Sequence, residues 1–106
     1  MKIWLGLLFE MIFKKINTRR ITNWKTFHNV FIKEFGFPDY YGRNMNAWID
    51  CMDDFLVESV VIDLGNCNEL KENNPDILEA ILECSAFINH RRTVNGENSF
   101  IIISMT

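Results

Sequence analysis

Three aspartates, Asp50, Asp53 and Asp54, are spaced so that a helix would place their carboxylates on one face. Such a face could hold a divalent cation, or it could present carboxylates to arginine and lysine side chains of another protein. No histidine or loop-ligand pattern accompanies the three aspartates, so the cation site is the weaker hypothesis. A plain solvated helix face is the third interpretation. In a protein partner, these carboxylates would suit a basic site that normally binds phosphates.

Two adjacent tyrosines, Tyr40 and Tyr41, precede the acidic segment in a loop rich in turn residues. Rigid aromatic side chains are typical anchors at protein interfaces, although the same rings could equally pack into the core. Asn44 is predicted first as the N-cap of the following helix. Gly42 is predicted first as a glycine that the backbone conformation of the loop requires.

A catalytic arrangement of Cys51, His28 and Asp50 as nucleophile, base and orienting group is conceivable, but nothing in their spacing supports it. The chain also lacks a glycine-rich phosphate loop and a G-K-[ST] motif. We therefore expect a protein that is not an enzyme and that binds no cofactor or metal.

The chain has 106 residues, 48% of them hydrophobic, and a formal charge of −3. This length allows one hydrophobic core, and the composition is that of a globular domain. A pI near 5.3 argues against a protein that wraps nucleic acid. Three cysteines without CxxC spacing indicate free thiols in a reducing compartment, and hence a cytoplasmic protein.

The charges are unevenly distributed along the chain. Residues 1–37 carry seven basic and two acidic side chains, whereas residues 38–106 carry four basic and twelve acidic ones. Such charge asymmetry is informative about binding partners rather than about the fold.

The elements that must position these residues follow from the hydrophobic pattern. We predict strands near 11–16, 60–64 and 100–104, and helices over 24–35, from the Asn44 cap to Phe55, and from Pro75 to Phe87. Residues 65–74 and 90–98 are predicted to be polar loops. Thr22 or Asn23 caps the first helix, Gly36 ends it, and Trp24 and Trp48 are expected in the core.

Strands that are apolar on both faces, alternating with helices, predict a small parallel sheet covered by helices. We expect one domain spanning residues 1–106. Residues 1–10 resemble a signal peptide only weakly, because Glu10 and two lysines follow the apolar run and no cleavage site is present; they are interpreted instead as an N-terminal strand extension or a leader.

The segment from Phe37 to Cys51, FPDYYGRNMNAWIDC, resembles the barstar family of small ribonuclease inhibitors. The family pattern has a proline, an acid, two tyrosines, a glycine and an asparagine, followed by a helix that carries an aspartate and a cysteine. The resemblance extends over most of residues 13–104. It implies an α/β, barstar-like fold, with a three-stranded parallel sheet packed by three to four helices.

The resemblance also implies the residues that would contact a nuclease. Tyr40, Gly42 and Asn44 correspond to loop positions that touch the enzyme. Asp50 corresponds to the aspartate that enters its phosphate site, and Glu83 corresponds to a second acidic contact.

Four positions on the second and third helices depart from barstar itself, and the loop after the third helix is longer. Asn46 replaces an aspartate, and Ile49 replaces a contact tryptophan. Asp53 replaces a threonine, and Phe87 replaces another contact acid.

We therefore expect an intracellular immunity protein, monomeric when free, that occludes the active site of a basic extracellular-type ribonuclease or toxin nuclease domain. No direct contact with nucleic acid or membrane is expected. The alternatives are a module that binds another basic protein and a small metal- or ligand-dependent enzyme. An inhibitor should present an exposed convex acidic face, whereas an enzyme should gather polar groups in a cleft. The candidate partner-binding residues are Tyr40, Tyr41, Gly42, Asn44, Asn46, Ile49, Asp50, Asp53, Asp54 and Glu83.

Overall fold

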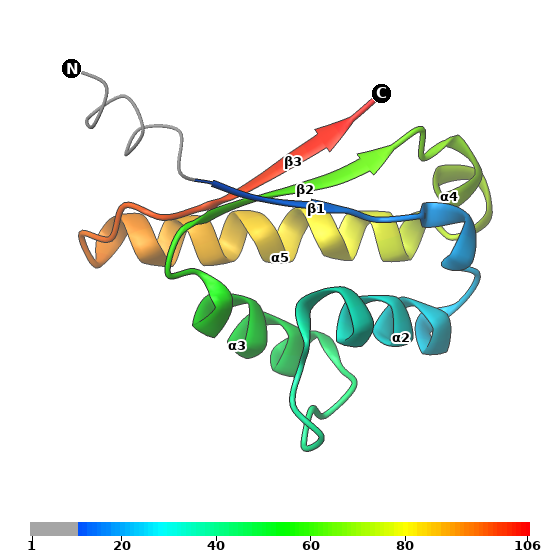
Figure 1. Ribbon diagram of the computed structural model, residues 1–106. Helices are drawn as coiled ribbons and strands as arrows, with labels where there is room; N and C mark the ends of the chain where they lie inside the picture. Colours follow the sequence, from blue (N-terminus) through cyan, green and yellow to red (C-terminus); the bar gives the residue numbers. More distant parts are fainter. Residues whose placement is uncertain (1–10) are drawn as a thin grey trace.

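The computed structural model describes residues 11–106 (Figure 1). The interpretation of residues 1–10 as an extension or leader lies outside the described residues. The elements, in chain order, are β1 (Met11–Lys15), η1 (Thr18–Arg20), α2 (Trp24–Phe35), α3 (Met45–Phe55), β2 (Ser59–Gly65), α4 (Asn68–Asn73), α5 (Pro75–Val94) and β3 (Ile101–Met105). This order confirms the predicted α/β fold, with a three-stranded parallel sheet packed by helices.

The sheet has the order β1-β2-β3, and both neighbouring pairs are parallel. Parallel crossovers are right-handed, so two successive steps in one direction place both connections on the same face. Figure 1 shows α2, α3 and α5 together on one side of the sheet. The helices α2, α3 and α5 therefore pack against a single face of the sheet (Figure 1). On the uncovered face, Phe13 and Ile102 are 69% and 45% exposed, in register with Val61 between them.

Helix α2 begins and ends at the residues that the local signals predict. The Asn23 side chain accepts a hydrogen bond from the backbone N–H of Thr26, and the Thr26 side chain reciprocates in a capping box. Gly36 ends the helix in the left-handed region, at φ 64°. Phe27 and Phe31 are fully buried, and the Phe31 ring meets the equally buried Trp48 edge-on at 5.6 Å.

Trp24 was predicted to lie in the core, and this prediction was wrong. Trp24 is 38% exposed at the start of α2, where its indole N–H donates to Asp76 at the start of α5. The amphipathic indole can lie at the edge of the core because its N–H has a polar partner there.

Two predicted loops are partly helical. The short helix α4 lies inside the predicted loop 65–74, where it buries Leu70. Helix α5 continues to Val94, well into the predicted loop 90–98. Its last turns are held by Arg92, a buried polar residue that a hydrophobic pattern does not reveal.

Candidate functional site

The loop that leads into α3 is fixed to α2 by Tyr41. This side chain is buried, and its hydroxyl lies 2.6 Å from Nδ1 of the buried His28. The backbone N–H of Tyr41 donates to the carbonyl of Pro38. The loop therefore points one tyrosine inward and leaves the other outside, since Tyr40 is 87% exposed. Tyr40 is the tyrosine that a partner can reach.

Burial keeps both members of this pair neutral. It raises the pKa of Tyr41 well above its usual value. Burial also lowers the pKa of His28, and the nearby Arg43 guanidinium lowers it further. Two neutral groups can share a buried hydrogen bond without the cost of a buried charge.

Arg43 provides a second attachment of the loop. Its guanidinium donates to the Asn29 side chain at 2.6 Å and to the Lys25 carbonyl at 3.2 Å, both on α2. Arg43 also adopts a positive φ of 53°, which is uncommon for a residue other than glycine. Gly42 does not adopt one, so its predicted role as a backbone requirement was wrong. A Cβ at Gly42 would lie 3.4 Å from Ala47 and from Asn44.

Asn44 caps α3, as predicted. Its side-chain oxygen accepts a hydrogen bond of 2.8 Å from the backbone N–H of Ala47, and its amide lies 3.3 Å from the Gly42 carbonyl. The cap and the loop attachments together set the position at which α3 begins. Helix α3 then buries Trp48 and Met52 and directs its polar residues away from the core.

An open groove of about 560 Å³ lies between α3 and α5, so the convex acidic face expected of an inhibitor was wrong for this part of the surface. It brings together four of the predicted contact residues, three from α3 and one from α5. Its lining consists of Asn46, Ile49, Asp50, Glu83, Cys84, Phe87 and Arg91.

Burial and nearby carboxylates raise the pKa values of two thiols. Burial raises the pKa of Cys51, and the neighbouring Asp54 and Asp50 raise it further. Burial and Glu83 do the same for Cys84. The protonated thiols are poor nucleophiles. Since His28 is bonded to Tyr41, the geometry gives no support to a Cys51-based catalytic arrangement.

Asp53 differs from the other two aspartates because it pairs within the chain. One of its carboxylate oxygens lies 2.9 Å from Arg92 and the other lies 3.5 Å from Arg91. The three aspartates are therefore not equivalent. Asp50 and Asp54 are exposed, whereas Asp53 is partly buried and holds α3 against α5.

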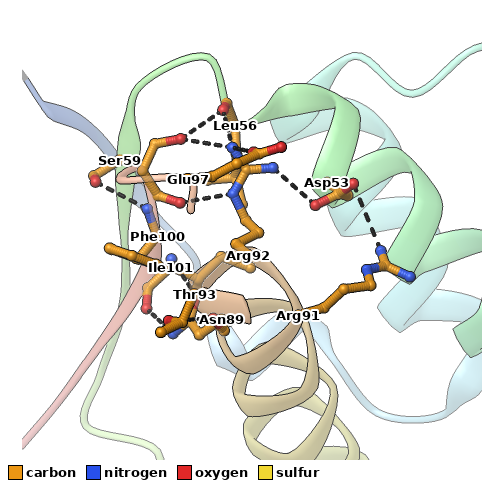
Figure 2. Close-up of polar contacts among 11 residues, drawn as sticks. Asp53, Leu56, Ser59, Asn89, Arg91, Arg92, Thr93, Glu97, Phe100 and Ile101 are labelled. Atoms are coloured by element: carbon orange, nitrogen blue, oxygen red, sulfur yellow. Dashed lines mark hydrogen bonds and ion pairs between the residues drawn. The ribbon is translucent and has the colours of Figure 1, made fainter. Parts of the chain in front are cut away.

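Arg92 is the centre of a polar network that joins α3, α5 and the segment before β3 (Figure 2). Its side chain is only 9% exposed. Besides Asp53, it donates to the Leu56 carbonyl and to the carbonyl and hydroxyl of Ser99 at 2.7–2.9 Å, and it pairs with Glu97 at 2.6 Å. The network fixes the C-terminal end of α3 as the loop fixes its start.

Sequence reasoning missed Arg91 and Cys84 as groove residues, and it noted Phe87 only as a difference from barstar. The Arg91 guanidinium lies 5.3 Å from the centre of the Phe87 ring, within cation–π distance. Glu83, Phe87 and Arg91 follow one another at intervals of four, so the helical period could have placed them on one face.

Among residues 11–106, no group of three or more His, Cys, Asp or Glu side chains could hold a metal ion. No helix in this part of the chain is long and apolar enough to cross a membrane.

A sequence model of the protein family described as Barstar (barnase inhibitor) matches residues 11–103, from the first residue of β1 to the middle of β3. The chain belongs to the Barstar family. The match includes both helices of the groove and the loop that carries Tyr40, so the candidate site lies wholly within the Barstar region. Membership of the Barstar family indicates a barnase-inhibitor-like role, and thus binding to a ribonuclease.

Proposed function

We propose that this protein is an intracellular immunity protein that occludes the active site of a basic ribonuclease or toxin nuclease with α3 and the preceding loop. One observation carries the proposal: the groove gathers Asn46, Ile49, Asp50 and Glu83 from two helices that are far apart in sequence. In the same structure, the loop before α3 displays the ring of Tyr40.

The charges of this surface suit a basic partner. Within the described residues, Asp50, Asp54 and Glu83 are exposed, and the acidic side chains that form ion pairs are Asp53 and Glu97. A nuclease site that binds phosphodiesters through arginine and lysine could pair with the three exposed carboxylates. Long-range attraction would also speed association at low salt, a behaviour for which the barnase–barstar pair is itself a reference example.

Arg91 gives the groove a selective feature. A positive charge beside Asp50 and Glu83 would repel a uniformly basic partner surface and favour one with a neutral or acidic group at that point. Together with Asn46 and Ile49, Arg91 would make the preferred nuclease differ from the one that barstar itself inhibits.

The test measures binding to barnase and to a panel of small basic ribonucleases and toxin nuclease domains. Asp50→Asn and Glu83→Gln remove one negative charge each while keeping nearly the same shape. Because hydrogen bonds to charged groups contribute about 1.5–3 kcal/mol, Asp50→Asn should weaken binding to the true target by about 10- to 150-fold. Glu72→Gln on α4, which removes an exposed charge outside the groove, serves as the matched control and should leave the affinity nearly unchanged.

Binding that responds equally to Asp50→Asn and Glu72→Gln would contradict the assignment of the site. Binding only to a basic protein that does not cleave RNA or DNA would replace the inhibitor proposal with the alternative of a different Barstar-fold binding module.

A further inference from the structure

A second cavity, of about 630 Å³, lies where β1 and β2 end. It is bounded by the turn that contains η1, by the second half of α2 and by the residues that follow β2. It shares no lining residue with the groove between α3 and α5. Its lining consists of Lys15, Ile16, Asn17, Thr18, Arg19, Arg20, Val30, Lys33, Glu34, Leu64, Gly65 and Asn66.

The lining of this cavity is strongly basic in a protein whose net charge is negative. Four of its side chains are cationic, and Glu34 is its one acid; the four are Lys15, Arg19, Arg20 and Lys33. Within residues 11–106, the basic side chains that form ion pairs are Arg91 and Arg92, at the other end of the chain. The four cations around the cavity repel one another, with Glu34 as the one acid of the lining to offset them, and a bound anion would relieve the remaining repulsion.

The position and size of the cavity favour a small ligand. The cavity lies beyond the carboxyl ends of two parallel strands, where Lys15 ends β1 and Gly65 ends β2. A volume of about 630 Å³ falls within the range of small-molecule sites, roughly 300–1,000 Å³. A long polyanion is disfavoured because twelve of the fourteen acidic residues lie in the remainder of the chain, after residue 37.

We propose that this cavity binds a small molecule that carries two or three linked phosphate groups, such as a nucleoside polyphosphate. Arg19 and Arg20 can each present a planar fork of donors to phosphate oxygens, and Lys15 and Lys33 add point charges from β1 and α2. The side chains of Asn17 and Asn66 add NH2 donors to the lining, since their oxygens already accept from the backbone N–H groups of Arg19 and Asn68.

The test is calorimetric titration of the whole protein with pyrophosphate and with ATP. Saturable binding of both is expected, and the Arg19→Gln/Arg20→Gln double variant should weaken it at least about tenfold. Lys33→Gln, on a different element, should also weaken binding and provides a second variant if the double variant does not fold. Its matched control is Lys71→Gln on α4, which removes an exposed lysine outside the cavity and should not change the affinity.

A short single-stranded RNA provides the competing outcome. Binding of RNA without saturable binding of pyrophosphate or ATP would overturn the proposal and indicate a nucleic-acid surface. Absence of binding of both phosphate probes, or equal affinities for wild type and the double variant, would also overturn it. The inhibitor function can be judged separately, because the double variant changes no groove residue and should bind its nuclease as the wild type does.

Discussion

Replacing Arg92 with methionine should lower the free energy of unfolding by about 3 kcal/mol. The change keeps an unbranched apolar stem but removes every donor that reaches Asp53, Leu56 and Ser99 at 2.7–2.9 Å. Removal of one partner from a buried ion pair typically costs about 3–5 kcal/mol. We expect the lower end of this range because Asp53 and Glu97 are 31% and 49% exposed and can regain water.

The neighbouring Arg91 provides the matched control. Arg91→Met removes the same charge from the same helix, but this side chain is 38% exposed and its ion pair with Asp53 is 3.5 Å long. Its loss should cost less than about 1 kcal/mol. Urea unfolding of both variants, followed by tryptophan fluorescence, gives the two values directly, and the slope should match that of the wild type. Equal losses in the two variants, or a loss below about 0.5 kcal/mol for Arg92→Met, would refute the role of the network.

Three further outcomes follow from the buried pair and the thiols. Tyr41→Phe should destabilise the protein by about 1–2 kcal/mol because it removes the hydroxyl partner of His28, whereas Tyr40→Phe should change stability by less than about 0.5 kcal/mol in the same unfolding assay. The pKa of His28 is lowered in the folded protein, so the unfolded state binds a proton more readily. The free energy of unfolding should therefore be highest above pH 6.5 and should decline as the pH falls below that value. The decline should be shallower in His28→Asn. Because the pKa values of Cys51 and Cys84 are raised, both thiols should react with iodoacetamide more slowly in the folded protein than in urea, and mass spectrometry of each labelled cysteine would contradict this if the rates were equal.

Local signals in the sequence were sufficient for most of the fold. The limits of α2 follow from the Asn23 cap and from Gly36, because both act on the adjacent backbone alone. Helix α4 escaped prediction because it has six residues, no side-chain cap and one buried side chain, Leu70, which is too little for a periodic pattern.

Interactions between distant residues account for what sequence reasoning missed in the site. Nothing local distinguishes Tyr40 from Tyr41. The distinction arises because His28, 13 residues earlier, shares a hydrogen bond with the Tyr41 hydroxyl. Asp53 shares the helical face of Asp50 and Asp54, but its carboxylate is held by Arg92, 39 residues later. The family resemblance anticipated the groove residues Asp50 and Glu83, which only the packing of α3 against α5 brings together.

The most direct test of the proposed function is inhibition of RNA cleavage by barnase, or by the panel nuclease that binds most tightly, titrated with wild-type protein and with Asp50→Asn at low and high salt. We expect the wild type to abolish cleavage at one equivalent, with slower association at high salt, and Asp50→Asn to require a large excess. Cleavage that continues unchanged with the wild type in excess over every nuclease of the panel would contradict the inhibitor function.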